Sequence, residues 1–194
     1  PVFIGGDDVT GVTFDGFTLD SEILDLTAGF TLDSENLDLT GAPGAHTTML
    51  RISEGAVDVI VTNNIIQNEE NNGKGIIVED GGGTGPDGTT TGNQVGIDVT
   101  ENAISGFTTG VRVIASNQTL EDVTIENNEF FDNDSGIGIL EDKDKSVLLG
   151  SVDIKGNTFE ASNQTAITIG ADPFDENSIT IEDNVFEELD ADSP

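Results

Sequence analysis

The feature that most constrains this chain is a short phrase that recurs along it. The phrase is an aliphatic residue, any residue, a second aliphatic residue, two further residues, Asn, any residue, and then an aliphatic residue or Phe. Recurrence at intervals of about 20 to 50 residues is typical of solenoids, in which each repeat forms one coil of a stack. Five copies occur, at Val59 to Ile66, Ile97 to Ile104, Val123 to Phe130, Val152 to Phe159 and Ile179 to Phe186.

The intervals between the copies predict loops at the corners of the coils. Successive Asn residues of the phrase are 38, 26, 29 and 27 residues apart, which suits coils whose connections differ in length. The longest interval contains a Gly-rich stretch at about 80–94, which we expect to form a loop outside the stack. An earlier apolar copy, Val12 to Leu19, has Phe17 where the others have Asn.

Each repeat contains a second apolar strand about ten residues beyond its Asn. Alternate side chains of a strand point to the same face, so the aliphatic residues of both strands should line one interior. Coils stacked at about 4.8 Å would share a core that a single coil could not bury. The second strands are Met49–Ile52, Gly75–Val78, Gly110–Val113, Gly136–Ile139 and Ala166–Ile169.

The Asn of each phrase is predicted to be structural. At a sharp turn its amide can donate a hydrogen bond to one neighbouring coil and accept one from the other, which satisfies buried polar groups. We therefore expect a ladder that runs along the stack. Its members are Asn64, Asn102, Asn128, Asn157 and Asn184.

Over about residues 9–189 these phrases resemble the repeat of the pectate-lyase-like superfamily. The resemblance implies an all-β, right-handed parallel β-helix of about six coils, which we expect to form one domain over residues 1–194. An insertion at about 20–46 should enlarge the first corner, because residues 17–27 recur nearly unchanged at 30–40. We interpret this duplication as a protruding hairpin or a cover for the sheet edge.

The charge of the chain points to high salt and excludes nucleic acid as a partner. Six Lys and Arg stand against 38 Asp and Glu, for a net charge of -32. Such a surface repels itself and a phosphate backbone alike. Molar salt shortens the Debye length to about 3 Å, so we interpret the composition as halophilic.

The sequence favours a location outside the cytoplasm, on the cell surface or in the medium. No apolar run reaches the roughly 18 residues of a membrane span, and an export signal would lie outside the given sequence. With no Cys, the chain has neither a disulfide framework nor a thiolate metal site. Three sequons, at Asn117, Asn133 and Asn163, fall in predicted corners where a glycan could project.

Enzymatic candidates come from the resemblance. Lyases of the superfamily use Arg or Lys as a base, and the matching candidates are Arg51, Arg112 and Lys74. Arg51 and Arg112 occupy the same outward position two coils apart, about 10 Å, with Ile77 between them. Arg residues placed in this way can hold an acidic sugar or simply pair with carboxylates. The single His46 has no Ser or Cys partner that would complete a triad.

The outward residues of the Asn-bearing strands form an acidic and hydroxyl face. We interpret this face as a hydrated surface that requires no cofactor, with binding of Ca²⁺ or other cations as the alternative. Asp132 and Asp134 resemble half of a calcium loop. The outward pairs are Thr13 and Asp15, Asp58 and Thr62, Asp98 and Thr100, Thr124 and Glu126, Asp153 and Lys155, and Thr180 and Glu182.

Because the repeat specifies a fold rather than a reaction, two functions stay open. The first is a non-catalytic extracellular module, acting as a surface scaffold, adhesin or fibre component in a high-salt organism or its virus. The second is a secreted polysaccharide lyase or hydrolase acting on an acidic glycan, although the chain lacks the Trp and Tyr on which sugars stack. Expected partners are a glycan or surface molecule, and other subunits or chain segments at the ends of the stack.

Overall fold

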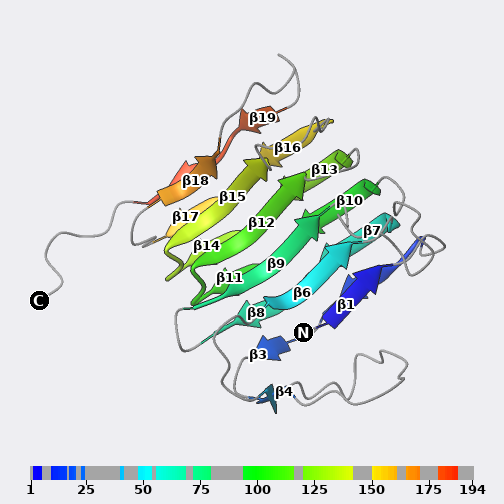
Figure 1. The fold of residues 1–194 in the computed structure, drawn as a ribbon. Helices are drawn as coiled ribbons and strands as arrows, with labels where there is room; N and C mark the ends of the chain where they lie inside the picture. The colour runs from blue at the N-terminus through cyan, green and yellow to red at the C-terminus, as the bar shows by residue number, and fades with distance from the viewer. Residues whose placement is uncertain are drawn as a thin grey trace, which may run out of the picture.

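The protein is seen in a computed structural model that describes residues 2–5, 10–16, 18–20, 23–24, 40–41, 48–53, 56–68, 72–79, 94–115, 120–141, 150–160, 165–170 and 179–187. Within these ranges the regular structure consists of strands, arranged as three six-stranded sheets and one two-stranded pair. All the recorded strand pairs are parallel, and the coils rise one above another (Figure 1). The predicted fold class, a parallel β-helix, is therefore confirmed.

Each coil contributes one strand to each sheet. Sheet A has the order β1 (Val2–Gly5), β6 (Thr48–Ser53), β9 (Lys74–Glu79), β12 (Thr109–Ala115), β15 (Ser135–Glu141), β18 (Thr165–Ile169). Sheet B has the order β2 (Thr13–Asp15), β7 (Val57–Thr62), β10 (Gln94–Thr100), β13 (Leu120–Glu126), β16 (Val152–Lys155), β19 (Ile179–Glu182). Sheet C has the order β3 (Thr18–Asp20), β8 (Ile65–Gln67), β11 (Ala103–Ser105), β14 (Glu129–Phe131), β17 (Thr158–Glu160), β20 (Val185–Phe186).

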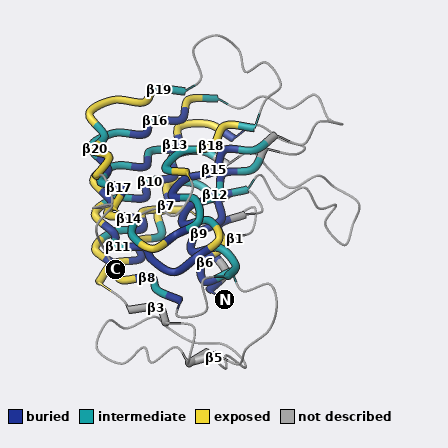
Figure 2. The backbone as a smooth tube through the Cα atoms, turned by 90° about the vertical axis from the view of Figure 1, so that its left-hand side faces the viewer, coloured by how far each residue is buried: buried dark blue, intermediate teal, exposed yellow. Residues whose placement is uncertain are grey.

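The core consists of columns in which equivalent residues of successive coils lie side by side. In sheet B, Val99 pairs with Val61 below and with Ile125 above, and all three are fully buried. Figure 2 shows buried residues along the inside of the coils and exposed residues on the outer turns. Full burial of a Val or Ile side chain contributes about 1.5 to 3 kcal/mol. The shared column therefore explains why the aliphatic phrase repeats.

The sharp turn predicted at each ladder Asn divides the phrase between two sheets, and this division was not predicted. The residue before each ladder Asn has a positive φ, for example 56° at Asn63, 56° at Asn127 and 55° at Asp183. Asn and Asp tolerate this left-handed conformation better than most residues, and the chain turns sharply there. The last apolar residue of the phrase consequently lies on sheet C rather than continuing sheet B.

Aromatic residues form a stack inside sheet C. The ring centroids of Phe130 and Phe159 lie 5.0 Å apart, and those of Phe159 and Phe186 lie 5.3 Å apart. Opposite them, a glycine is the second residue of strands β9, β12 and β15 of sheet A, and a Cβ at Gly136 would lie 2.6 Å from the Phe159 ring. These glycines recur in sequence because each makes room for a large residue of the facing strand.

The first corner holds two further departures from the sequence prediction. Strand β1 pairs with β6, with Val2 opposite Leu50 and Ile4 opposite Ile52, although no strand was expected there. Within the insertion, β4 (Ile23–Leu24) and β5 (Thr40–Gly41) pair in parallel. The two strands of a hairpin pair antiparallel, so the hairpin interpretation is wrong for β4 and β5. Residues 25–39, and the Gly-rich stretch over 80–93, lie outside the described residues.

Candidate functional site

The structure joins the five repeated asparagines into one ladder along the turn between sheets B and C. Asn102 donates from its backbone N–H to Oδ1 of Asn128 at 3.0 Å, and its Nδ2 donates to the same oxygen at 3.0 Å. Asn128 makes the equivalent pair of bonds to Asn157. The pattern also joins Asn64 to Asn102, and Asn157 to Asn184.

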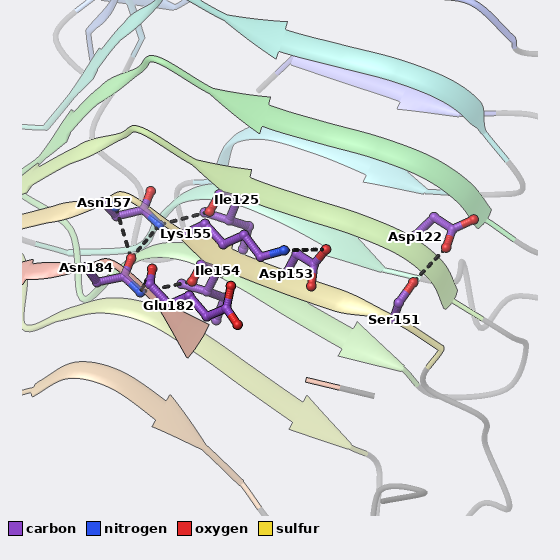
Figure 3. A network of polar contacts seen from close by, with 9 residues as sticks. All are labelled: Asp122, Ile125, Ser151, Asp153, Ile154, Lys155, Asn157, Glu182 and Asn184. Carbon is purple, nitrogen blue, oxygen red and sulfur yellow. Dashed lines mark hydrogen bonds and ion pairs between the residues drawn. The ribbon is translucent and has the colours of Figure 1, made fainter. Parts of the chain in front are cut away.

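The ladder amides also hold the backbone of the coil below. Nδ2 of Asn157 donates to the carbonyl of Ile125 at 2.8 Å, and Nδ2 of Asn184 donates to that of Ile154 at 2.9 Å (Figure 3). The ladder Asn residues inside the stack are buried, so the bonds replace contacts with water. Both hydrogens of each ladder amide bond within the protein, which leaves these side chains no donor for a ligand.

Another buried Asn, outside the ladder, occupies the next turn and bears on glycosylation. Asn133 is fully buried, its Nδ2 donates to the Ile104 carbonyl at 2.8 Å, and its Oδ1 accepts from the Phe107 N–H at 3.0 Å. Attaching a glycan to this amide in the folded protein would break these bonds. The other two predicted acceptors, Asn117 and Asn163, lie outside the described residues, as does His46.

The outer face of sheet B carries two columns of mostly polar residues, with one correction to the predicted set. In one column Ile60, rather than Asp58, lies between Thr13 and Asp98, and Ile60 is 38% exposed. Asp58 has φ 55° and no strand partner, because the pairing passes from Val57 opposite Val95 to Val59 opposite Ile97. Gly96, the counterpart of Asp58 in the next coil, also has a positive φ of 71°, so an aligned kink without an inserted residue keeps Asp58 out of the column.

Along these columns, like charges rarely lie next to one another. Upward from Asp98, the first column continues as Thr124, Asp153 and Thr180. In the second column, Thr62, Thr100 and Glu126 are followed by Lys155 and Glu182. Carboxylates stacked directly at the coil spacing would repel each other, and hydroxyls and Lys155 separate them.

Several hydrogen bonds connect this face across the coils. Thr100 Oγ1 donates to Thr62 Oγ1 at 3.2 Å. Ser151 Oγ donates to Asp122 at 2.6 Å (Figure 3). The Nζ of Lys155 lies 3.2 Å from the Asp153 carboxylate. A hydrogen bond from Thr180, together with Lys155, holds the pKa of Asp153 below its ordinary value of 3.8, against the opposing effect of burial.

The candidate catalytic residues align only in part. The register places Ile77 between Arg51 and Arg112, which confirms their predicted alignment on the outer face of sheet A. Arg51 forms an ion pair with Glu79, whereas the buried Arg112 Nε has no hydrogen-bond partner among the described residues. Lys74 lies three residues before Ile77, about 10 Å along the strand. A catalytic role for the three residues stays a prediction.

The proposed half calcium loop offers few free ligand atoms. Asp132 is exposed with φ 54°, and Asp134 is half-buried. Between them, Asn133 points into the core, where its oxygen already accepts a backbone hydrogen bond. In the part of the chain that the structure describes, no group of three or more His, Cys, Asp and Glu side chains is placed to hold a metal ion.

Comparison with known protein families gives a match over most of the chain. Residues 43–192 match the model of a family described as periplasmic copper-binding protein (NosD). Neither the curated proteins nor the solved structures contain a match. Across the described residues, no helix is long and apolar enough to cross a membrane. The family's periplasmic location agrees with the expectation that the chain works outside the cytoplasm.

The family match corrects the cofactor prediction. We expected no required cofactor, with Ca²⁺ or other cations as candidate ligands, whereas the family is described by copper. Copper sites in proteins rely chiefly on imidazole, thiolate and thioether groups. This chain has no Cys, one His and one Met, and Met49 is fully buried in the core. The residues that the structure describes therefore do not fit a copper site, and no chemistry of this chain is assigned to that metal.

Proposed function

The chain belongs to the NosD family, and we propose that it is a non-catalytic β-helix module that serves as a surface scaffold, adhesin or fibre component outside the cytoplasm. The family's description names a location and a binding property and no reaction. The module works in a high-salt organism or its virus. The composition supports this part of the proposal, because a net charge of -32 requires screening.

The observation that carries this proposal is that the repeated polar residues bond within the protein itself. The side chains of Asn102, Asn128 and Asn157 form hydrogen bonds with one another and with backbone carbonyls. On the outer faces, Arg51 pairs with Glu79, and Lys155 pairs with Asp153. A repeat built in this way produces a rigid rod with solvated faces, which is what a scaffold requires.

The proposal is tested by measuring binding to cell envelopes alongside catalysis. The labelled chain should bind isolated envelopes of a halophilic host saturably in molar salt, and Arg112→Ala should bind equally. On pectate and alginate, neither protein should release unsaturated uronate products above the blank. Absence of saturable envelope binding would contradict the scaffold and adhesin roles.

One observation favours a second candidate, a lyase or hydrolase acting on an acidic glycan. Arg112 lies on the outer face of sheet A, and its buried Nε has no partner among the described residues, so a carboxylate of a uronate could complete it. In the same uronate assay, release of product by the unaltered chain and its loss in Arg112→Ala would establish this function instead.

A further inference from the structure

The two ends of the stack differ in how well their apolar residues are covered. At the end formed by β18, β19 and β20, Ile169 is 42%, Ile181 is 44% and Phe186 is 59% exposed, as Figure 2 shows for β19 and β20. Their partners one coil below, Ile139, Ile154 and Phe159, are at most 2% exposed. At the other end, Val2, Ile4 and Phe14 are at most 6% exposed. Among the residues whose burial is described, the β18–β20 end is therefore the one that presents an open core.

Polar groups at this end have no further coil to pair with among the described residues. In the coils below, the residue before the ladder Asn donates its N–H to a carbonyl of the next coil, as Asn127 does to Lys155 and Gly156 to Glu182. The ladder Asn donates its own N–H to the next carboxamide, as Asn157 does to Asn184. Among the described residues, the N–H groups of Asp183 and Asn184 have no such acceptor. The missing partner is thus a parallel strand that brings its own Asn.

The charge at this end distinguishes between possible occupants. Along the outer column, Glu126 is followed by Lys155 and then by Glu182. If the charges continue to alternate, the residue that stacks on Glu182 is a Lys or Arg. A second copy of the chain joined end to end through this face would bring together two sets of exposed carboxylates, from Glu182, Asp183 and Glu187. Like charges at this separation repel, which disfavours the second copy.

We propose that the β18–β20 end docks one coil-forming segment of a partner polypeptide, which extends the helix by parallel strand addition. The segment carries two alternating aliphatic residues over Ile179 and Ile181, Lys or Arg over Glu182, Asn over Asn184 and an apolar ring over Phe186. Main-chain hydrogen bonds supply the general attraction, and the side-chain columns select the register. The inference deepens the proposed scaffold function, because it gives the module a specific point of assembly.

The chain's own residues 150–160 supply the test segment. This stretch contains Val152, Ile154, Lys155, Asn157 and Phe159 at the required spacing. A fluorescein-labelled peptide of this sequence is titrated with the full chain in molar KCl, and anisotropy is recorded. We expect saturable binding at a peptide to protein ratio of one. Changing the peptide by Lys155→Glu should weaken binding about two- to fivefold, the range of an exposed ion pair.

Two protein variants locate the binding surface. Phe186→Asp, at a largely exposed position that should leave the fold intact by circular dichroism, should abolish peptide binding. Glu182→Lys should reverse the preference, so that the Lys155→Glu peptide binds better than the unaltered one. Binding that survives Phe186→Asp, or no saturable binding by the unaltered chain, would overturn the proposal.

A second copy of the chain at this end would give a different result from a partner segment. If sedimentation shows a concentration-dependent dimer that Phe186→Asp dissociates, a second copy covers this end and the partner segment is wrong. Failure of the inference is separable from failure of the proposed function. If the chain binds cell envelopes but not the peptide, the scaffold proposal stands and the docking proposal is wrong. If it binds the peptide but not envelopes, the docking proposal stands and the scaffold proposal is wrong.

Discussion

The ladder asparagines repeat in sequence but differ in how deeply they are held. Asn128 is fully buried, and its side chain both donates to Val99 and Asn157 and accepts from Asn102. Asn184 makes similar bonds at the open end, where it is half-buried and water can replace a lost partner. The cost of removing an amide should therefore depend on its position in the stack.

We predict that Asn128→Ala lowers the free energy of unfolding by about 2 to 4 kcal/mol, because it leaves several buried groups without partners. Asn184→Ala is the matched control and should lower it by about 1 kcal/mol. Urea unfolding followed by circular dichroism in molar KCl measures both. Equal losses at the two positions would mean that the ladder contributes through something other than buried hydrogen bonds.

The carboxyl group of Asp153, on the outer face of sheet B, makes the stability of the protein depend on pH. Its pKa is lowered, first by the hydrogen bond from Thr180 and then by Lys155. A lowered folded-state pKa adds stability that is fully present above the unfolded pKa and is lost as the pH falls through the folded value. Because the side chain is 38% exposed, solvent weakens this contribution.

We predict that Thr180→Val raises the pKa of Asp153 toward 3.8, since valine keeps the shape of threonine and removes the hydroxyl donor. Carboxyl chemical shifts recorded by NMR between about pH 2 and 6 measure this value directly. Thr124→Val, one coil below on the same column, is the control for a general change in the surface. An unchanged pKa in Thr180→Val would show that the hydroxyl does not hold the carboxylate.

Among the elements, strand β15 contains two glycines with opposite surroundings. A Cβ on Gly136 would lie 2.6 Å from the Phe159 ring, whereas one on Gly138 would lie 3.3 Å from the Thr109 methyl group on the other face. We predict that Gly136→Ala destabilises the protein by about 1 to 3 kcal/mol through overpacking, and that Gly138→Ala changes stability by less than about 1 kcal/mol. Thermal unfolding of both variants in one buffer decides this. Similar melting temperatures would show that the phenylalanine stack can move aside.

How much of each element could be foreseen depended on the kind of signal in the sequence. Sheets A and B could be predicted from the alternation of aliphatic residues, because every second side chain of these strands is buried in the core. Sheet C could not be separated from sheet B, since the turn depends on the φ of residues as different as Asn63 and Glu101. Strand β1 has too few residues for a period to be visible.

The outer face was predicted less well than the core, for a physical reason. Asp58 was predicted in a column that Ile60 occupies, because the outward residue between Val59 and Val61 is aliphatic rather than polar. Glycines or acidic residues with positive φ stand at the equivalent positions Gly11, Gly96 and Asp122, and this was the available signal. The family's association with copper could not have been predicted, because the chain lacks the donors that usually indicate such a site.

At the scale of the whole molecule, stacking sets the distance between charges. Equivalent outward residues of adjacent coils lie about 4.8 Å apart. The Debye length is about 8 Å at physiological ionic strength and about 3 Å in molar salt, so only the latter is shorter than the coil spacing. A net charge of -32 is therefore poorly screened between coils until the salt concentration is high.

We predict that the melting temperature rises by roughly 10 °C between about 0.1 and 3 M KCl, as expected for removal of a few kcal/mol of repulsion in a domain of this size. Circular dichroism at the β-sheet minimum follows unfolding, and light scattering follows association. Sorbitol is the control for exclusion of solutes from the surface, because it lacks ions and should produce a smaller rise. A melting temperature indifferent to KCl, or equal stabilisation by sorbitol, would mean that charge repulsion does not limit the stack and that its acidic surface serves another purpose.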